Sequence, residues 1–99
     1  MIQGTTPTHT FDIPFDTALI NKMRILYAQN NKLVLEKENA DCSIDGNTIT
    51  VRLTQEDTLK FVADALVQIQ LRILTAGGDA LASDIVNVDC RRILDDEVL

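Results

Sequence analysis

Two stretches of this chain alternate strictly between apolar and polar residues, and no other feature limits its possible folds as much. In "LVQIQLRIL" every second residue is apolar, and "TITVRL" repeats the pattern over a shorter length. A period of two directs successive side chains to opposite faces, so each stretch predicts a strand with one buried face. The residues expected to face inward are Ile49, Val51, Leu53, Val67, Ile69, Leu71 and Ile73.

Turn residues separate these strands from other strand-like runs. The pair Asp45-Gly46 predicts a hairpin, and Asn30-Asn31 predicts another because asparagine tolerates positive φ. Gly77 and Gly78 in "TAGGDA" form the turn of a long hairpin in the last third of the chain. Both glycines are free to take positive φ.

The return strand of this last hairpin, "LASDIVNVDC", changes phase near Ile85-Val86. A β-bulge would cause such a change. With that slip, Val86, Val88 and Cys90 carry the inward face.

The first predicted strand lies in "HTFDIPF", where Phe11, Ile13 and Phe15 share one face. Pro14 has no N–H to donate to a neighbouring strand. This strand is therefore expected to lie at a sheet edge or to end at the proline.

The segment 17–29 is ambiguous. Its apolar spacing suits a helix capped by Asp16, but the alternation of Met23, Ile25 and Tyr27 suits a strand equally well. A strand from about Lys22 to Gln29 is favoured, because it forms a hairpin with "KLVLEKE". Whether the segment begins as a helix stays open.

The acidic pair Glu56 and Asp57 follows Thr54, which predicts a short helical turn. Thr54 can cap that turn, and Asp57 three residues later completes a capping box. The turn would carry the chain from one sheet to the other. Paired carboxylates also serve as general acid and base, but no histidine and no second acidic pair accompany them nearby in the sequence. We therefore expect a folding role and no catalysis.

These elements predict an all-β, antiparallel, immunoglobulin-like β-sandwich of about seven strands. The chain of 99 residues is long enough for one core, so residues 1–99 are expected as a single domain. Residues 1–8 and 93–99 are expected as flexible ends. With no Trp, one Tyr and three Phe, the core should be mostly aliphatic.

The net charge of −6 disfavours nucleic acid and anionic membranes as partners, because both require clustered basic residues. The first ten residues lack the basic and apolar regions of a secretory signal, so synthesis and folding in a cytoplasm are expected. In that reducing setting Cys42 and Cys90 should behave as small hydrophobic residues. Whether the two cysteines meet stays open.

No catalytic, cofactor-binding or metal-binding residue is expected, and the protein is expected not to be an enzyme. His9 is the sole histidine and is interpreted as a surface or strand-edge residue. Asp84, Asn87 and Asp89 lack the glycine and terminal glutamate of an EF-hand loop and are interpreted as a solvated strand face.

Two further features suggest contacts but no chemistry. The basic pair Arg91-Arg92 precedes "DDE" and is expected to form an internal ion-pair cluster. Tyr27 and the exposed side of "QIQLRIL" are weak candidates for a contact surface.

The phrases "GTTPTHTFDIPFD", "DCSIDGNTITVRLTQEDTLKF" and "VQIQLRILTAGGDALASDI" cover most of the chain. In them the sequence resembles small proteins encoded among the tail and baseplate genes of phages and prophages of Gram-positive bacteria. More loosely, it is similar to the N-terminal β-sandwich domain of phage baseplate upper proteins, which attaches to the tail and carries receptor-binding parts. Such proteins continue into coiled-coil and receptor-binding regions, whereas this chain stops at Leu99, so a free-standing module is expected.

The resemblance implies a non-enzymatic structural or adaptor protein, whose partners are other tail or baseplate proteins or further copies of itself. Sheet edges are the expected docking sites, because their unpaired N–H and C=O groups accept another strand. The alternative is a soluble β-sandwich module that binds a carbohydrate or another ligand. Such sites usually need stacked aromatic residues, which are few here.

Overall fold

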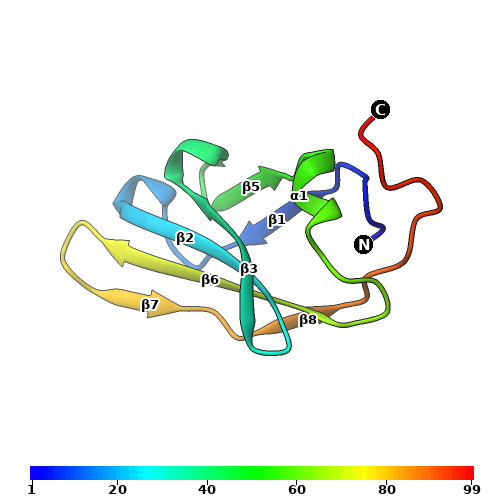
Figure 1. The fold of residues 1–99 in the computed structure, drawn as a ribbon. Coiled ribbons are helices and arrows are strands. Elements are labelled where there is room, and N and C mark those ends of the chain that lie inside the picture. The colour runs from blue at the N-terminus through cyan, green and yellow to red at the C-terminus, as the bar shows by residue number, and fades with distance from the viewer.

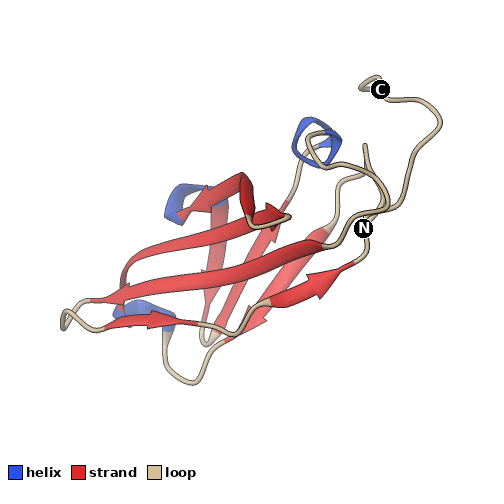
Figure 2. Ribbon diagram, turned by 60° about the horizontal axis from the view of Figure 1, so that its bottom comes forward, coloured by secondary structure: helices blue, strands red, loops and turns tan.

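The protein is a two-layer antiparallel β-sandwich, described for residues 1–99 by a computed structural model (Figures 1 and 2). This confirms the predicted fold class, with eight strands where about seven were expected. The strands are β1 (Thr8–Asp12), β2 (Ile20–Gln29), β3 (Lys32–Glu38), β4 (Cys42–Asp45), β5 (Thr48–Arg52), β6 (Val67–Thr75), β7 (Ala80–Ala82) and β8 (Val86–Val88). The short helices are η1 (Thr17–Leu19), η2 (Asn39–Asp41) and α1 (Gln55–Leu59).

The strand order is that of an immunoglobulin sandwich. One sheet has the order β1-β5-β4, and the other has the order β3-β2-β6, with β7 and β8 both paired to the far side of β6. In immunoglobulin domains, strands B, E and D face strands C′, C, F and G in this arrangement. Strand A, which flanks strand B in those domains, has no counterpart beside β1 here.

The core lies between the two sheets and follows the predicted alternation. All seven residues that were expected to face inward are buried. Six of them lie in β5 and β6, and the seventh, Leu53, directly follows β5. Tyr27 and Phe61 are the only aromatic residues among the fourteen of the core, which confirms a mostly aliphatic interior. None of the helices is long and apolar enough to cross a membrane.

The predicted turns are present. Asn30 and Asn31 adopt φ values of 52° and 61° and connect β2 to β3. Gly46 turns the hairpin between β4 and β5 with φ 56°, and in the last hairpin Gly78 but not Gly77 takes positive φ.

The ambiguous segment is mainly the strand β2, which begins after one turn of 3-10 helix. Asp16 caps that turn, because its Oδ1 accepts a hydrogen bond of 2.9 Å from the N–H of Ala18. The strand and the helical beginning therefore both exist, in succession.

The return strand breaks in two, and the register against β6 shifts by one residue between β7 and β8. Ser83 lies at the break, where its Oγ accepts a 2.9 Å hydrogen bond from the N–H of Leu71. The predicted phase change is thus confirmed, but the expected burial of Val86 is wrong. Val86 lies opposite the inward-facing Ile69 and is still 54% exposed, because the other sheet does not cover this edge.

Strand β1 lies at a sheet edge and ends at Asp12, before Pro14, as the proline predicted. The chain ends lie near α1 (Figure 1). Ile2 forms an isolated parallel bridge with Arg91, and the N–H of Leu99 donates to Gln55 Oε1 at 2.8 Å.

Candidate functional site

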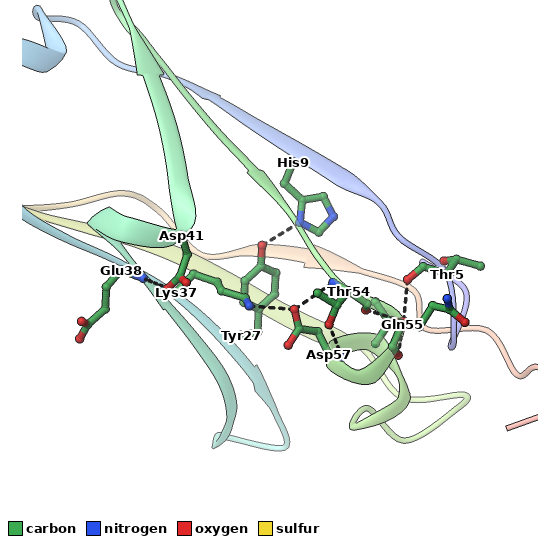
Figure 3. Close-up of polar contacts among 10 residues, drawn as sticks. Thr5, His9, Tyr27, Lys37, Glu38, Asp41, Thr54, Gln55 and Asp57 are labelled. Atoms are coloured by element: carbon green, nitrogen blue, oxygen red, sulfur yellow. Dashed lines mark hydrogen bonds and ion pairs between the residues drawn. The ribbon is translucent and has the colours of Figure 1, made fainter. Parts of the chain in front are cut away.

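The acidic turn is the first place to look for chemistry, and its Asp57 is fully engaged in structure. Thr54 and Asp57 form the predicted capping box: Thr54 N donates to Asp57 Oδ2 at 2.9 Å, and Asp57 N donates to Thr54 Oγ1 at 3.1 Å (Figure 3). Glu56 is exposed while Asp57 is buried, so the two carboxylates do not act as a pair.

A lysine from the five-stranded sheet completes this arrangement and was not predicted from the sequence. Lys37, on the edge strand β3, places its Nζ 2.8 Å from Asp57 Oδ2, with the two side chains only 15% and 9% exposed (Figure 3). Burial alone raises the pKa of Asp57. The hydrogen bonds from Lys37 and Thr54 and the charge of Lys37 outweigh it, so the pKa lies below its ordinary value. Side chains alternate along a strand, so Lys37, two residues after the buried Leu35, is directed to the same inward face. This alternation was the feature of the sequence that could have identified Lys37.

His9 and Tyr27 form a second polar contact between the sheets. Nδ1 of His9 lies 2.8 Å from the hydroxyl oxygen of the fully buried Tyr27 (Figure 3). His9 thus lies on an edge strand, as one of the two expected interpretations had it, but it is not a surface residue, because it shares the inward side of β1 with Phe11. Burial, together with the charge of the N-terminus, lowers the pKa of His9, and burial also raises the pKa of Tyr27 well above its ordinary value. Both groups are consequently neutral near pH 7.

This polar cluster, made of His9, Tyr27, Lys37, Thr54 and Asp57, offers little for catalysis. Both cysteines are free thiols. For Cys42, burial and the charge of Asp41 raise the thiol pKa, against a smaller opposing effect of Lys37. A protonated thiol is a weak nucleophile. The cluster instead links β1 to β2 through His9 and Tyr27, and β3 to α1 through Lys37 and Asp57.

No group of three or more His, Cys, Asp or Glu residues is placed to hold a metal ion. Arg91 and Arg92 are exposed and form no ion pair, so the expected ion-pair cluster with the acidic tail is wrong. Because both side chains are exposed, water solvates their charges.

The free edge of β1 is the second candidate site. At one end of the strand, Leu53 N donates to Pro7 O at 2.9 Å, and at the other Ile13 N donates to Asn47 O at 2.8 Å. Hydrogen bonding alternates along an antiparallel pair, so the odd-numbered residues between Pro7 and Ile13 also direct their backbone groups toward β5. The even-numbered residues direct theirs the other way.

Three residues, Thr8, Thr10 and Asp12, thus present N–H and C=O groups to the open side of β1. No strand pairs with that side. Their side chains point away from the core, while those of the odd-numbered residues point toward it.

An apolar groove of about 520 Å³ opens beneath this edge, between β1 and the strands β6 and β7 of the other sheet. The side chain of Leu81 at its mouth is 43% exposed, although Leu81 lies opposite the buried Ile73. We call the free edge and this groove together the open seam. Its large apolar lining residues are Phe11, Ile13, Phe15, Leu71, Ile73 and Leu81.

The apolar surface continues past the groove. An adjoining hollow shares Phe15 and Leu81 with it and adds the exposed Leu19. Asp12 is the only charged residue that lines the groove, and Asp79 the only one in the hollow. A contiguous apolar surface of this kind is typical of an interaction site.

Fold and site together define a class: a β-sandwich with immunoglobulin strand order, open along the edge where strand A would lie. Comparisons of the chain with protein-family models, with curated proteins and with solved structures found no match.

Proposed function

We propose that this protein is a non-enzymatic structural or adaptor protein of a phage or prophage, associated with the tail or baseplate, which acts through protein–protein contacts. The phage setting is supported by the sequence resemblance. The contact function is supported by one observation, the open seam, where unpaired backbone groups border an apolar groove.

The seam fits strand addition better than it fits chemistry. An incoming extended segment can pair with the N–H and C=O groups of Thr8, Thr10 and Asp12, and its alternate side chains then enter the groove. The main-chain bonds supply affinity and the groove supplies selectivity. His9, Tyr27 and Asp57, whose pKa values are shifted, lie instead in the polar cluster, where each has a polar partner.

The partners in this proposal are other tail or baseplate proteins, or further copies of the chain. The net charge of −6 argues against nucleic acid and anionic membranes. Synthesis takes place in the host cytoplasm, and the assembled protein resides in the virion tail.

The proposal is tested by purifying phage particles from an induced lysogen that carries the gene. We expect the protein to band with intact particles in a density gradient, at a fixed ratio to the tail proteins, as measured by quantitative mass spectrometry. A strain with the gene deleted provides the control and should yield particles with defective tails or reduced adsorption. Recovery only in the soluble fraction, with normal particles from the deletion strain, would refute the proposal.

A ligand-binding module is the second candidate, favoured by the size of the groove. Its volume of about 520 Å³ falls within the range of small-molecule sites, and Phe11 and Phe15 could stack on a ligand. A glycan array, followed by a thermal-shift screen of apolar ligands, separates the two candidates. Saturable binding that Phe11→Ser abolishes would support this second function.

A further inference from the structure

The open side of β1 lacks the features by which proteins usually prevent strand pairing at an edge. Such edges are commonly protected by lysine, proline, a bulge or a covering segment. Within β1, "THTFD", there is no lysine and no proline, and its register with β5 is regular. The position that strand A occupies in immunoglobulin domains is thus accessible to another strand.

We propose that the strand which pairs there is β1 of a second copy, running antiparallel about a two-fold axis at Thr10. The inference rests on the proposed function, in which the protein acts by protein–protein contact. In this register Thr8 lies opposite Asp12 of the second copy, and Thr10 lies opposite its own equivalent. All three free N–H and C=O pairs of each strand are then used.

Registers shifted toward the C-terminus are worse. A shift of two residues toward the C-terminus brings Pro14 into the ladder, where it has no N–H to donate. The register at Thr10 also keeps Asp12 away from its equivalent, which avoids like charges at directly opposite positions. Threonine pairs across strands are favourable, and Thr8 can donate its hydroxyl to the Asp12 carboxylate.

The same pairing closes the groove. It continues the three-stranded sheet of one copy into that of the other, with the inward faces on the same side, so the two groove mouths face each other. Phe11 of each copy lies opposite His9 of the other, and the exposed Leu81 approaches its equivalent across the seam. Removing these apolar side chains from water provides the main driving force.

Charge gives the dimer a characteristic salt dependence. Each copy carries a net charge of −6, so the two repel each other at long range. Salt screens this repulsion, and the screening length falls to about 3 Å at 1 M. Dimerisation should therefore strengthen as salt rises, whereas recognition of a basic partner would weaken.

The first test measures mass against concentration by sedimentation and light scattering. We expect the wild-type protein to pass from 11.0 kDa to about twice that value. Thr10→Pro removes an N–H that points to the open side and none that bonds to β5, so the monomer keeps its fold. It should dissociate at concentrations at least about tenfold higher than wild type, since two donors are lost per dimer. The matched control, Thr10→Val, keeps the N–H and should dimerise normally.

A second pair of variants tests the groove without altering the backbone. Leu81→Arg places a positive charge at the groove mouth of each copy and should also prevent dimerisation. Leu33→Arg is the control, because Leu33 is 54% exposed on β3, an edge strand of the same sheet remote from the seam. It should leave the mass of the dimer unchanged.

Amide hydrogen exchange locates the contact. The amides of Thr8, Thr10 and Asp12 should exchange quickly in the dilute monomer and become protected as concentration rises, while that of Phe11 is protected throughout. A mass of 11.0 kDa at all concentrations and salt levels overturns the inference, as does a dimer in which these amides stay unprotected. A monomer that still bands with phage particles refutes only the self-pairing, whereas a dimer absent from particles refutes only the phage role.

Discussion

Two of the edge strands, β1 and β3, border the same core but differ in composition. Four of the seven residues of β3 are charged, and one of these, Lys37, points inward to Asp57. Charged and inward-pointing residues are a common protection of sheet edges. In β1 the only charged residue is Asp12, and the groove beside it is apolar.

This difference indicates where the chain supplies its own partners and where it leaves a place for another molecule. On the β3 side, α1 provides a carboxylate for the buried lysine (Figure 3). On the β1 side, no strand pairs with the outward backbone groups, and the side chain of Leu81 at the groove is left 43% exposed. Intramolecular stability should therefore depend on the first region and association on the second.

The strongest test of this contrast is Lys37→Met, which leaves the Asp57 carboxylate buried without its cation. We expect the free energy of unfolding to fall by about 2–4 kcal/mol, because breaking one partner of a buried pair is much worse than replacing both. Chemical denaturation measures it. At the open seam, Leu81→Arg should change the stability of the monomer by less than about 0.5 kcal/mol.

The matched control is the more exposed ion pair of Arg24 and Glu36, whose side chains are 41% and 34% exposed. Arg24→Met should lower the free energy of unfolding by less than about 1 kcal/mol. Equal losses for Lys37→Met and Arg24→Met would show that burial gives the Lys37 pair no special weight. The contrast between the two edges would then fail.

A smaller loss in the free energy of unfolding is expected for Tyr27→Phe, which removes the hydroxyl group hydrogen-bonded to His9. The imidazole nitrogen is left half-buried without that partner, at a cost of about 1–2 kcal/mol. The double variant His9→Leu/Tyr27→Phe replaces both polar groups and should recover most of the loss. If the double variant is less stable than Tyr27→Phe, the hydrogen bond is not the source of the effect.

The sequence predicted the features that depend on local patterns. The inward faces of β5 and β6 follow from alternation, the turn at Asn30-Asn31 from backbone preference, and the cap at Thr54 from residue spacing. Each involves residues within one strand, turn or helix. The tertiary structure leaves these local features unchanged, so they could be predicted without knowing it.

Contacts between distant segments were not predicted. The bond between Lys37 and Asp57 joins residues from two separate elements, although alternation after Leu35 already directed the lysine inward. The same rule directs His9 to the inward side of β1. The exposure of Val86 depends on which strand lies opposite, and local sequence does not contain that information.

The candidate site shows the same limit. Sheet edges were expected to be the docking surfaces, but the choice of β1 depends on the strand order, which leaves its outer side unpaired. Strand order is set by the packing of the whole chain. The groove needs residues from β1, β6 and β7 together, so no single motif could have indicated it.

The smallest effect expected is on the pH dependence of stability, which reports on the polar cluster alone. The pKa of His9 lies below its ordinary value of 6.5, because burial and the N-terminal charge disfavour the imidazolium. The unfolded chain therefore binds the proton first. The stability contribution is complete above pH 6.5 and is lost as pH falls through the lower pKa of the folded state.

Protonation of Asp57 causes a second loss of stability, at lower pH. Its folded pKa is also below the ordinary value, 3.8, so its contribution is present above that pH and disappears as the carboxylate becomes protonated. Denaturation midpoints measured across the acid range should show both losses. His9→Gln should abolish the first and keep the second, while Leu81→Arg should keep both, because the open seam contributes neither group. A first loss that persists in His9→Gln would place its origin outside the polar cluster.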